Sequence, residues 1–198
     1  MSDDSAGTAV TSPVPRRLWD RYVRTAPSPP LAPIRARLWP GGKAVTWDSL
    51  DSATRAAVLD QYKVYVEGAD RISARRGVAN SFFLALNTAV VTLVGIVAEH
   101  PVRISAVMIL APWLALVVQC LAWFWILRSY RQLSSAKYAV IGAIEEALPS
   151  SPWWRAEWSA LGGGTDSTRY WPFSHVEQLI PALFAGVYSL GFLLLAVR

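Results

Sequence analysis

Residues 78–98 read VANSFFLALNTAVVTLVGIVA, a run of 21 residues without a charged side chain. Two more uncharged runs follow, ISAVMILAPWLALVVQCLAWFWIL at 104–127 and LIPALFAGVYSLGFLLLAV at 179–197. A hydrocarbon core about 30 Å thick is crossed by roughly 20 apolar residues in a helix. A charge at the centre of such a helix costs about 2.5–3.5 kcal/mol on insertion. The sequence therefore predicts an all-α integral membrane protein with three transmembrane helices.

The composition of the full chain agrees with a membrane protein. Hydrophobic residues make up 53% of the chain and charged residues only 17%, whereas a soluble domain has about 25% charged residues. The net charge is +5, but the basic residues gather beside the first two runs. We therefore expect membrane lipid, and no nucleic acid, as a partner. The single cysteine, Cys120, excludes an intramolecular disulfide and has no partner for a zinc site.

Basic residues beside the runs predict the orientation, because lysine and arginine near span ends favour the cytoplasm. The segment between the first two runs, 99–103, holds one arginine, Arg103, and the C-terminus holds only Arg198. We expect the N-terminus and residues 128–178 in the cytoplasm and the C-terminus outside. The basic residues on the cytoplasmic side are Lys63, Arg71, Arg75, Arg76, Arg128, Arg131 and Lys137.

Two segments before the first run differ in character. Residues 1–45 hold seven of the thirteen prolines, which interrupt helices, and predict a disordered, proline-rich cytoplasmic tail. Residues 46–77 predict an amphipathic cytoplasmic helix, because apolar or small residues recur at spacings of three and four. No proline separates this segment from the first span, so one helix can run from the cytoplasm into the membrane.

Residues 128–178 predict a cytoplasmic helical layer between the second and third spans. One helical face ends at Pro149, and Ser151 with Pro152 is typical of a new helix start. Ser174 and Glu177 have the spacing of a capping box that opens the third span. The aromatic residues of this segment suit either an interfacial belt or the core of the layer. They are Trp153, Trp154, Tyr170 and Trp171.

The chain shows no constellation of catalytic residues. Its two histidines, His100 and His175, lie near opposite membrane boundaries, and Gly162, Gly163 and Gly164 lack the lysine of a phosphate-binding loop. We expect no enzymatic activity, no cofactor and no metal site. The spans hold no ionisable Asp, Glu, His, Lys or Arg side chain, which counts against a pump or coupled transporter.

Polar residues inside the spans are the candidate functional site. Asn80 and Asn87 are seven residues apart, so they project from nearly the same face of a helix, with Thr88 beside them. Gln119 in the second span is a candidate partner. Two interpretations stay open, which are hydrogen bonding between helices and a polar face that lines a pore.

Several stretches resemble the RipA family of octameric membrane proteins. They are QYKVYVE (61–67), ADRISARR (69–76), ANSFFL (79–84), LNTA (86–89), SYRQL (129–133) and SAKY (135–138), with two shorter matches, EW (157–158) before the glycines and VE (176–177) before the third span. The resemblance covers roughly residues 59–194, and it implies a homo-octamer in the bacterial plasma (inner) membrane without an established reaction. A weaker similarity connects the chain to two-span SLATT-type effectors of bacterial conflict systems.

An oligomer would let charged residues near the membrane pair across subunits. We expect Asp70, Arg71 and Arg75 to pair with Glu145 or Glu146 of a neighbouring copy. With the octamer that the resemblance implies, we expect a homo-oligomeric membrane assembly with a structural or regulatory role and room for a cytoplasmic protein partner. The alternative is an oligomeric ion or solute channel or a membrane-perforating effector.

Overall fold

A computed structural model describes residues 29–39, 41, 45–98, 106–164, 168 and 173–196. Every regular element in these residues is helical, which confirms the all-α prediction. The elements are α2 (Leu31–Leu38), η2 (Trp47–Ser49), α3 (Ser52–Ala98), α4 (Ala106–Glu145), η3 (Pro152–Glu157), α5 (Trp158–Ala160), η4 (Gly162–Gly164) and α6 (Phe173–Ala196).

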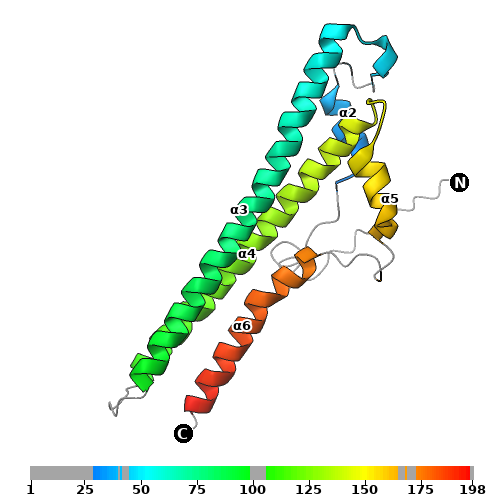
Figure 1. The fold of residues 1–198 in the computed structure, drawn as a ribbon. Coiled ribbons are helices and arrows are strands. Elements are labelled where there is room, and N and C mark those ends of the chain that lie inside the picture. Colours follow the sequence, from blue (N-terminus) through cyan, green and yellow to red (C-terminus); the bar gives the residue numbers. More distant parts are fainter. Residues whose placement is uncertain are drawn as a thin grey trace, which may run out of the picture.

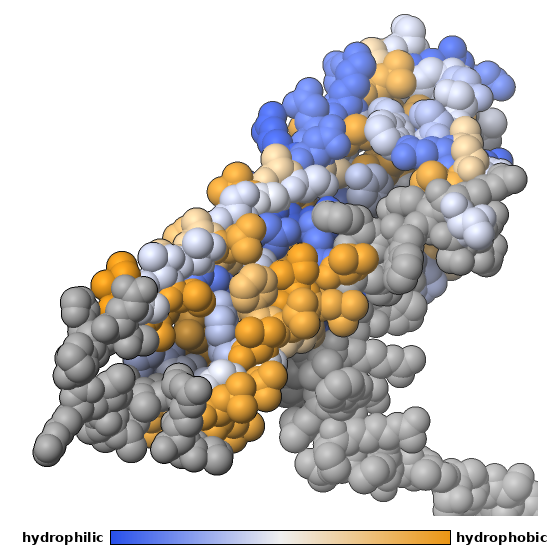
Figure 2. All heavy atoms as spheres, turned by 60° about the horizontal axis from the view of Figure 1, so that its bottom comes forward, coloured by the Kyte–Doolittle hydropathy of each residue, from blue (hydrophilic) through white to orange (hydrophobic). Residues whose placement is uncertain are grey.

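The long helices α3 and α4 lie side by side in antiparallel directions, and α6 packs along one half of this pair (Figure 1). Each of the three contains a stretch long and apolar enough to cross a membrane, within Ser52–Ile96, Leu110–Glu145 and Val176–Leu194. The structure thus confirms three membrane-spanning helices. Hydrophobic residues dominate the surface of the half that carries α6, and hydrophilic residues gather at the other end (Figure 2).

Both long helices extend well beyond their spans. The 47 residues of α3 correspond to about 70 Å of helix, more than twice the hydrocarbon thickness. The predicted cytoplasmic helix 46–77 and the first span 78–98 therefore form one continuous helix. Asp51 caps it, because its carboxylate accepts hydrogen bonds from the backbone N–H groups of Ala53 and Thr54 at 2.9 Å. The hydroxyl of Thr54 adds a third bond at 2.7 Å, and these bonds lower the pKa of Asp51.

The helix α2 differs from the predicted disordered tail over residues 1–45. Its Pro33 lies in the first turn, where a backbone N–H has no partner within the helix and proline is tolerated. The helix packs against α4. This tertiary contact stabilises a helix in a segment whose proline content predicted none. Residues 1–28 of the predicted tail lie outside the described residues, as do the turn 99–103 and Arg198.

The three spans share an aromatic core. Phe83 of α3 stacks on Trp123 of α4 with ring centroids 5.7 Å apart, and Phe184 of α6 lies 6.0 Å from the Trp123 ring. Phe83, Trp123 and Leu127 are buried, and Ile180 and Phe184 pack against them. This cluster fixes the rotation of each helix and so decides which polar side chains face inward.

A second packed region lies in the helical layer beyond the spans, which the end of α4 forms with η3 and α5. A Cβ added at Gly142 would lie 2.5 Å from the Trp154 ring, so this glycine makes room for the indole. Trp154 therefore belongs to the core of the layer, whereas Trp153 and Trp158 are 41% and 48% exposed. Tyr170 and Trp171 lie outside the described residues.

The predicted capping box at the start of the third span stays a prediction, because the side chain of Ser174 lies outside the part that the structure describes. The described helix begins at Phe173. The carboxylate of Glu177 bonds to side chains of α3, so this residue links two helices.

Candidate functional site

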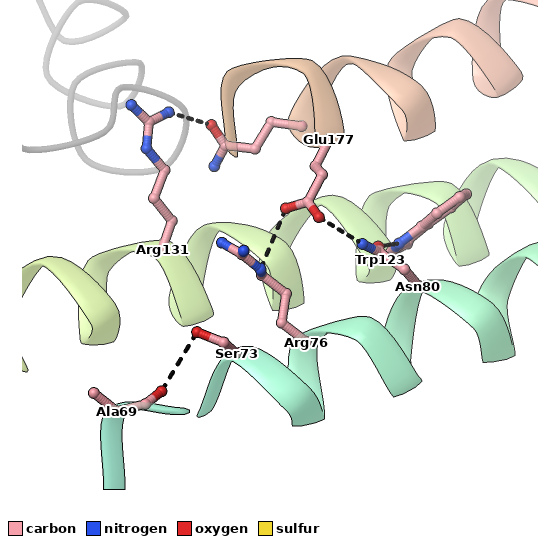
Figure 3. A network of polar contacts seen from close by, with 8 residues as sticks. Ala69, Ser73, Arg76, Asn80, Trp123, Arg131 and Glu177 are labelled. Carbon is pink, nitrogen blue, oxygen red and sulfur yellow. Dashed lines mark hydrogen bonds and ion pairs between the residues drawn. The ribbon is translucent and has the colours of Figure 1, made fainter. Parts of the chain in front are cut away.

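Glu177 is the centre of a polar cluster that joins all three spans near the membrane boundary. Its side chain is 8% exposed, and its carboxylate lies 3.3 Å from Nε of Arg76. It also accepts a hydrogen bond from the Asn80 amide at 3.2 Å. The indole N–H of Trp123 donates to the Asn80 carbonyl at 2.9 Å. The four side chains come from α3, α4 and α6 and point toward one another (Figure 3).

A second polar link follows beside this cluster. Arg131 of α4 donates to the side-chain oxygen of Gln178 on α6 at 2.8 Å (Figure 3). Burial lowers the pKa of Arg131. Consecutive residues of α6 thus hold α3 through Glu177 and α4 through Gln178, which fixes the start of the third span on the other two.

Asn87 makes the corresponding link deeper in the spans. It is fully buried, its carbonyl accepts a bond from the Tyr188 hydroxyl at 2.8 Å, and its amide donates to the backbone oxygen of Phe83 at 2.7 Å. A buried amide without partners is costly in hydrocarbon. Here both ends of the amide are satisfied within one chain.

The other two residues of the predicted polar face lie elsewhere. Thr88 is exposed on α3, and its hydroxyl donates to the backbone oxygen of Leu84 at 2.9 Å. The amide nitrogen of Gln119 is buried and has no hydrogen-bond partner within the described residues. The structure therefore brings Asn80 and Asn87 to neighbouring helices, and it does not join Gln119 to them.

Glu145 forms a third polar centre, at the end of α4. It is 1% exposed, and its carboxylate accepts hydrogen bonds from the hydroxyls of Tyr62 and Ser151, both at 2.7 Å. The backbone N–H groups of Trp153 and Trp154 donate to the same carboxylate at 3.2 and 2.9 Å. Glu145 thus caps the start of η3 from another helix. Burial, and then the contact with Glu145, raises the pKa of Tyr62.

The residues predicted to pair across subunits have different surroundings. Both oxygens of Glu146 accept bonds from the guanidinium of Arg35, a contact that raises the pKa of Arg35. Arg71 pairs with Glu67 at 3.1 Å within α3. Glu145, Glu146 and Arg71 therefore have partners in their own chain. Asp70 and Arg75 are exposed, without an ion pair in the described part of the chain, and their pairing with a neighbouring copy stays a prediction.

A family model matches residues 59–197, which include every side chain of these clusters except Arg35, and its description is Octameric membrane protein family (8xMP). The chain belongs to the octameric membrane protein family. This match confirms the resemblance found in the sequence, and it makes the chain a homo-oligomeric membrane protein. No curated protein and no solved structure matches the chain.

In this member of the octameric family, the polar centres hold helices together. No group of three His, Cys, Asp or Glu side chains in the described residues is arranged to hold a metal ion. An open pocket of about 420 Å³ lies beside Glu145, with Glu146, Ser151 and Arg155 among its lining residues. The carboxylates of Glu145 and Glu146 are bonded to the protein itself, so they stabilise the fold of the helical layer beyond the spans.

Sequence reasoning missed several members of these centres. Arg76 and Glu177 were visible as charges that flank spans, but their sequence separation hid their contact. Tyr188 and Trp123 looked like ordinary aromatic residues of spans. A signal was present, because both carry one polar group that needs a partner in hydrocarbon. Matching the polar groups of Trp123 and Tyr188 to the amides of Asn80 and Asn87 would have suggested these hydrogen-bonded pairs.

Proposed function

We propose that this chain forms a homo-octamer in the bacterial plasma membrane and serves as a structural or regulatory assembly without catalytic activity. The observation that supports the proposal is that buried polar side chains bond the helices of one chain to each other. Asn80, Asn87 and Glu177 all bond to other helices of the same chain. The subunit is therefore a self-sufficient bundle, suited to be a building block.

The orientation supports a role on the cytoplasmic side. The basic residues that flank the first two spans lie on the parts of α3 and α4 that extend beyond the membrane, and such residues favour the cytoplasm. These extensions, with α2 and η3, form a packed layer held by Glu145 and Glu146. We place the N-terminus and this layer in the cytoplasm, where the layer can contact a protein partner, and the C-terminus outside.

The test is native mass spectrometry of the protein in lipid nanodiscs together with flux measurements in liposomes. We expect a species of about eight times the 21.8 kDa chain mass and no flux of ions or small dyes above that of empty liposomes. The Asn87→Leu variant should lower the thermal stability of the subunit, because it removes the bond between α3 and Tyr188 of α6, and should leave flux unchanged. A monomer, or flux that Asn87→Leu alters while the octamer persists, would contradict the proposal.

An oligomeric channel is the second candidate, and one observation favours it. Ser81, Thr88 and Thr92 are exposed on α3. They lie seven and four residues apart, so they share one helical face, and this face points away from the buried Asn87. In a ring of subunits such a hydroxyl face would line a central path.

Cysteine labelling distinguishes the two candidates. In a Cys120→Ser background, Thr88→Cys should resist a charged thiol reagent if α3 faces lipid or another helix. Fast labelling of Thr88→Cys, with conductance blocked by the label, would support the channel. Ser52→Cys, which is exposed outside the spans, is the control for reagent access.

A further inference from the structure

An apolar groove lies in the cytoplasmic layer, where lipid cannot cover it. It has a volume of about 510 Å³ and lies between α2, α3 and α4, lined by Leu38, Asp60, Gln61, Val64, Tyr65, Val140 and Ile144. Val64 is 69% exposed at this groove. It precedes the first span at residue 78 by about 21 Å of helix, with basic residues between them. A protein surface, and not the bilayer, must therefore cover it.

A second exposed apolar surface lies on η3 and α5. Trp153 and Trp158 are 41% and 48% exposed, although the indole of Trp154 between them is anchored on Gly142. Exposed tryptophans on a rigid support are typical anchors of protein interfaces. Arg155 lies among them, exposed and without an ion pair in the residues that the structure describes.

The two surfaces lie at the same height on opposite sides of α4. Trp154 packs on Gly142, while Val140 and Ile144, two residues before and after it, line the groove. Two residues turn a helix through about 200°, so the groove and the tryptophans face away from each other. Figure 1 agrees, with α5 on the side of α4 away from α3.

This arrangement fits a closed ring. In such a ring, each subunit contacts the neighbour on one side with one surface and the neighbour on the other side with a different surface. Charge complements the shape. Asp60 lies at the groove, and its one ion pair among the described residues is an exposed contact with Lys63 at 3.5 Å. Arg155, beside the tryptophans, has the opposite sign.

We propose that Trp153 and Trp158 of one subunit dock into the groove around Val64 of the next copy, with Arg155 near Asp60. This contact closes the cytoplasmic layer of the assembly into a ring. The inference rests on the proposed octamer and adds the surface through which neighbouring copies meet.

Cysteine cross-linking tests the contact in the full chain. In a Cys120→Ser background, Val64→Cys combined with Trp158→Cys should give a ladder of covalent oligomers up to eight with a short bis-maleimide. Neither single variant should give a ladder. Ser52→Cys with Trp158→Cys is the matched control, because Ser52 is exposed on the same helix about 18 Å further along. It should give no ladder either.

Native mass spectrometry of the same samples tests the docking contact and the octamer separately. An octamer without a ladder would overturn the docking contact and leave the octamer standing. Dimers from Val64→Cys alone would overturn it as well, because they would place two grooves face to face. Loss of the oligomer from the Cys120→Ser parent would instead overturn the proposed function.

A charge exchange gives an independent test. Asp60→Arg and Arg155→Asp should each lower the octamer fraction at low salt, by at least twofold. The double variant should restore that fraction, because the two charges again have opposite signs. Equal loss in the double variant would contradict the pairing. Lys63→Ala, which removes only the partner of Asp60 within α3, should leave the octamer intact.

Discussion

At the scale of single residues, Glu145 is the side chain on which the helical layer beyond the spans depends most. Glu145→Ala leaves the hydroxyls of Tyr62 and Ser151 and two backbone N–H groups without their acceptor. An unsatisfied buried polar group costs about 1–3 kcal/mol, so we expect a loss of at least about 3 kcal/mol in unfolding free energy. Thermal unfolding of the detergent-solubilised protein measures it.

The matched control for that prediction is Glu157→Ala. Glu157 lies on η3 and is exposed, so this variant removes a nearby carboxylate of the same charge without opening a buried site. We expect a change within about 0.5 kcal/mol. Equal losses in the two variants would show that the buried hydrogen bonds of Glu145 are not what stabilises the layer.

Tyr62 gives the same site a dependence on pH. Its pKa is raised from the ordinary value of 10.0 by burial and by Glu145, so the folded chain holds this proton more tightly than the unfolded chain does. The contribution of Tyr62 to the free energy of unfolding is therefore fully present below pH 10, and it falls as the pH rises above 10. Tyr62→Phe should lose about 1 kcal/mol at neutral pH and show a shallower fall between pH 10 and 11. Chemical denaturation across that range checks it, and an identical slope in both proteins would contradict it.

The residue scale also shows what sequence alone could predict about the site. Hydrogen bonding between helices was one of two interpretations of the asparagines, because amides in hydrocarbon need partners, and Asn80 and Asn87 do have partners on other helices. Their partners were not predictable, because Tyr188 and Glu177 are about 100 residues away and the rotation of each helix is set by the packing around Trp123. Gln119, the partner that the sequence suggested, is not bonded to either asparagine.

At the scale of elements, the attachment of α6 to α3 rests on a nearly buried ion pair. Removing one partner of such a pair costs about 3–5 kcal/mol, because the other charge stays buried. We expect Glu177→Ala to destabilise the bundle by about 3 kcal/mol, since Arg76 is only 22% exposed. The double variant Arg76→Ala with Glu177→Ala should lose less than the sum of the single losses. Thermal stability in detergent measures each variant.

The exposed pair on α3 serves as the reference for this prediction. Glu67 and Arg71 are 63% and 74% exposed, and pairs of this kind contribute about 0.3–0.5 kcal/mol. Glu67→Ala should therefore be nearly neutral. A Glu177→Ala loss no larger than the Glu67→Ala loss would show that α6 is held by apolar packing alone.

The elements also show where sequence patterns fail. The uncharged runs predicted the three spans, because the cost of burying charge in lipid leaves a strong signal. The helix α2 was not predicted, because its proline lies in the one turn that tolerates it, and the contact of Arg35 with Glu146 joins segments 111 residues apart. The membrane spans can be predicted from local sequence patterns. The layer beyond them cannot, because its structure depends on contacts between segments that are distant in the sequence.

At the scale of the whole molecule, all three spans share one bundle whose long extensions lie at one end (Figure 1). The order of the helices follows directly from the sequence, since three spans place the two termini on opposite sides of the membrane. Which end is cytoplasmic depends only on charge. The basic residues of α3 and α4 lie on the extended end, and lysine and arginine are retained in the cytoplasm during insertion.

The distribution of basic residues predicts the result of a topology experiment. In a Cys120→Ser background, Ser52→Cys should be protected from a membrane-impermeant thiol reagent in intact cells and labelled after permeabilisation. A reporter fused after residue 198 should be active only outside the cytoplasm. Replacing Arg71, Arg75 and Arg76 with glutamine should weaken the bias and produce a mixed orientation, because these arginines precede the first span directly. Labelling of Ser52→Cys in intact cells, with a reporter active in the cytoplasm, would reverse the assignment and place the layer outside.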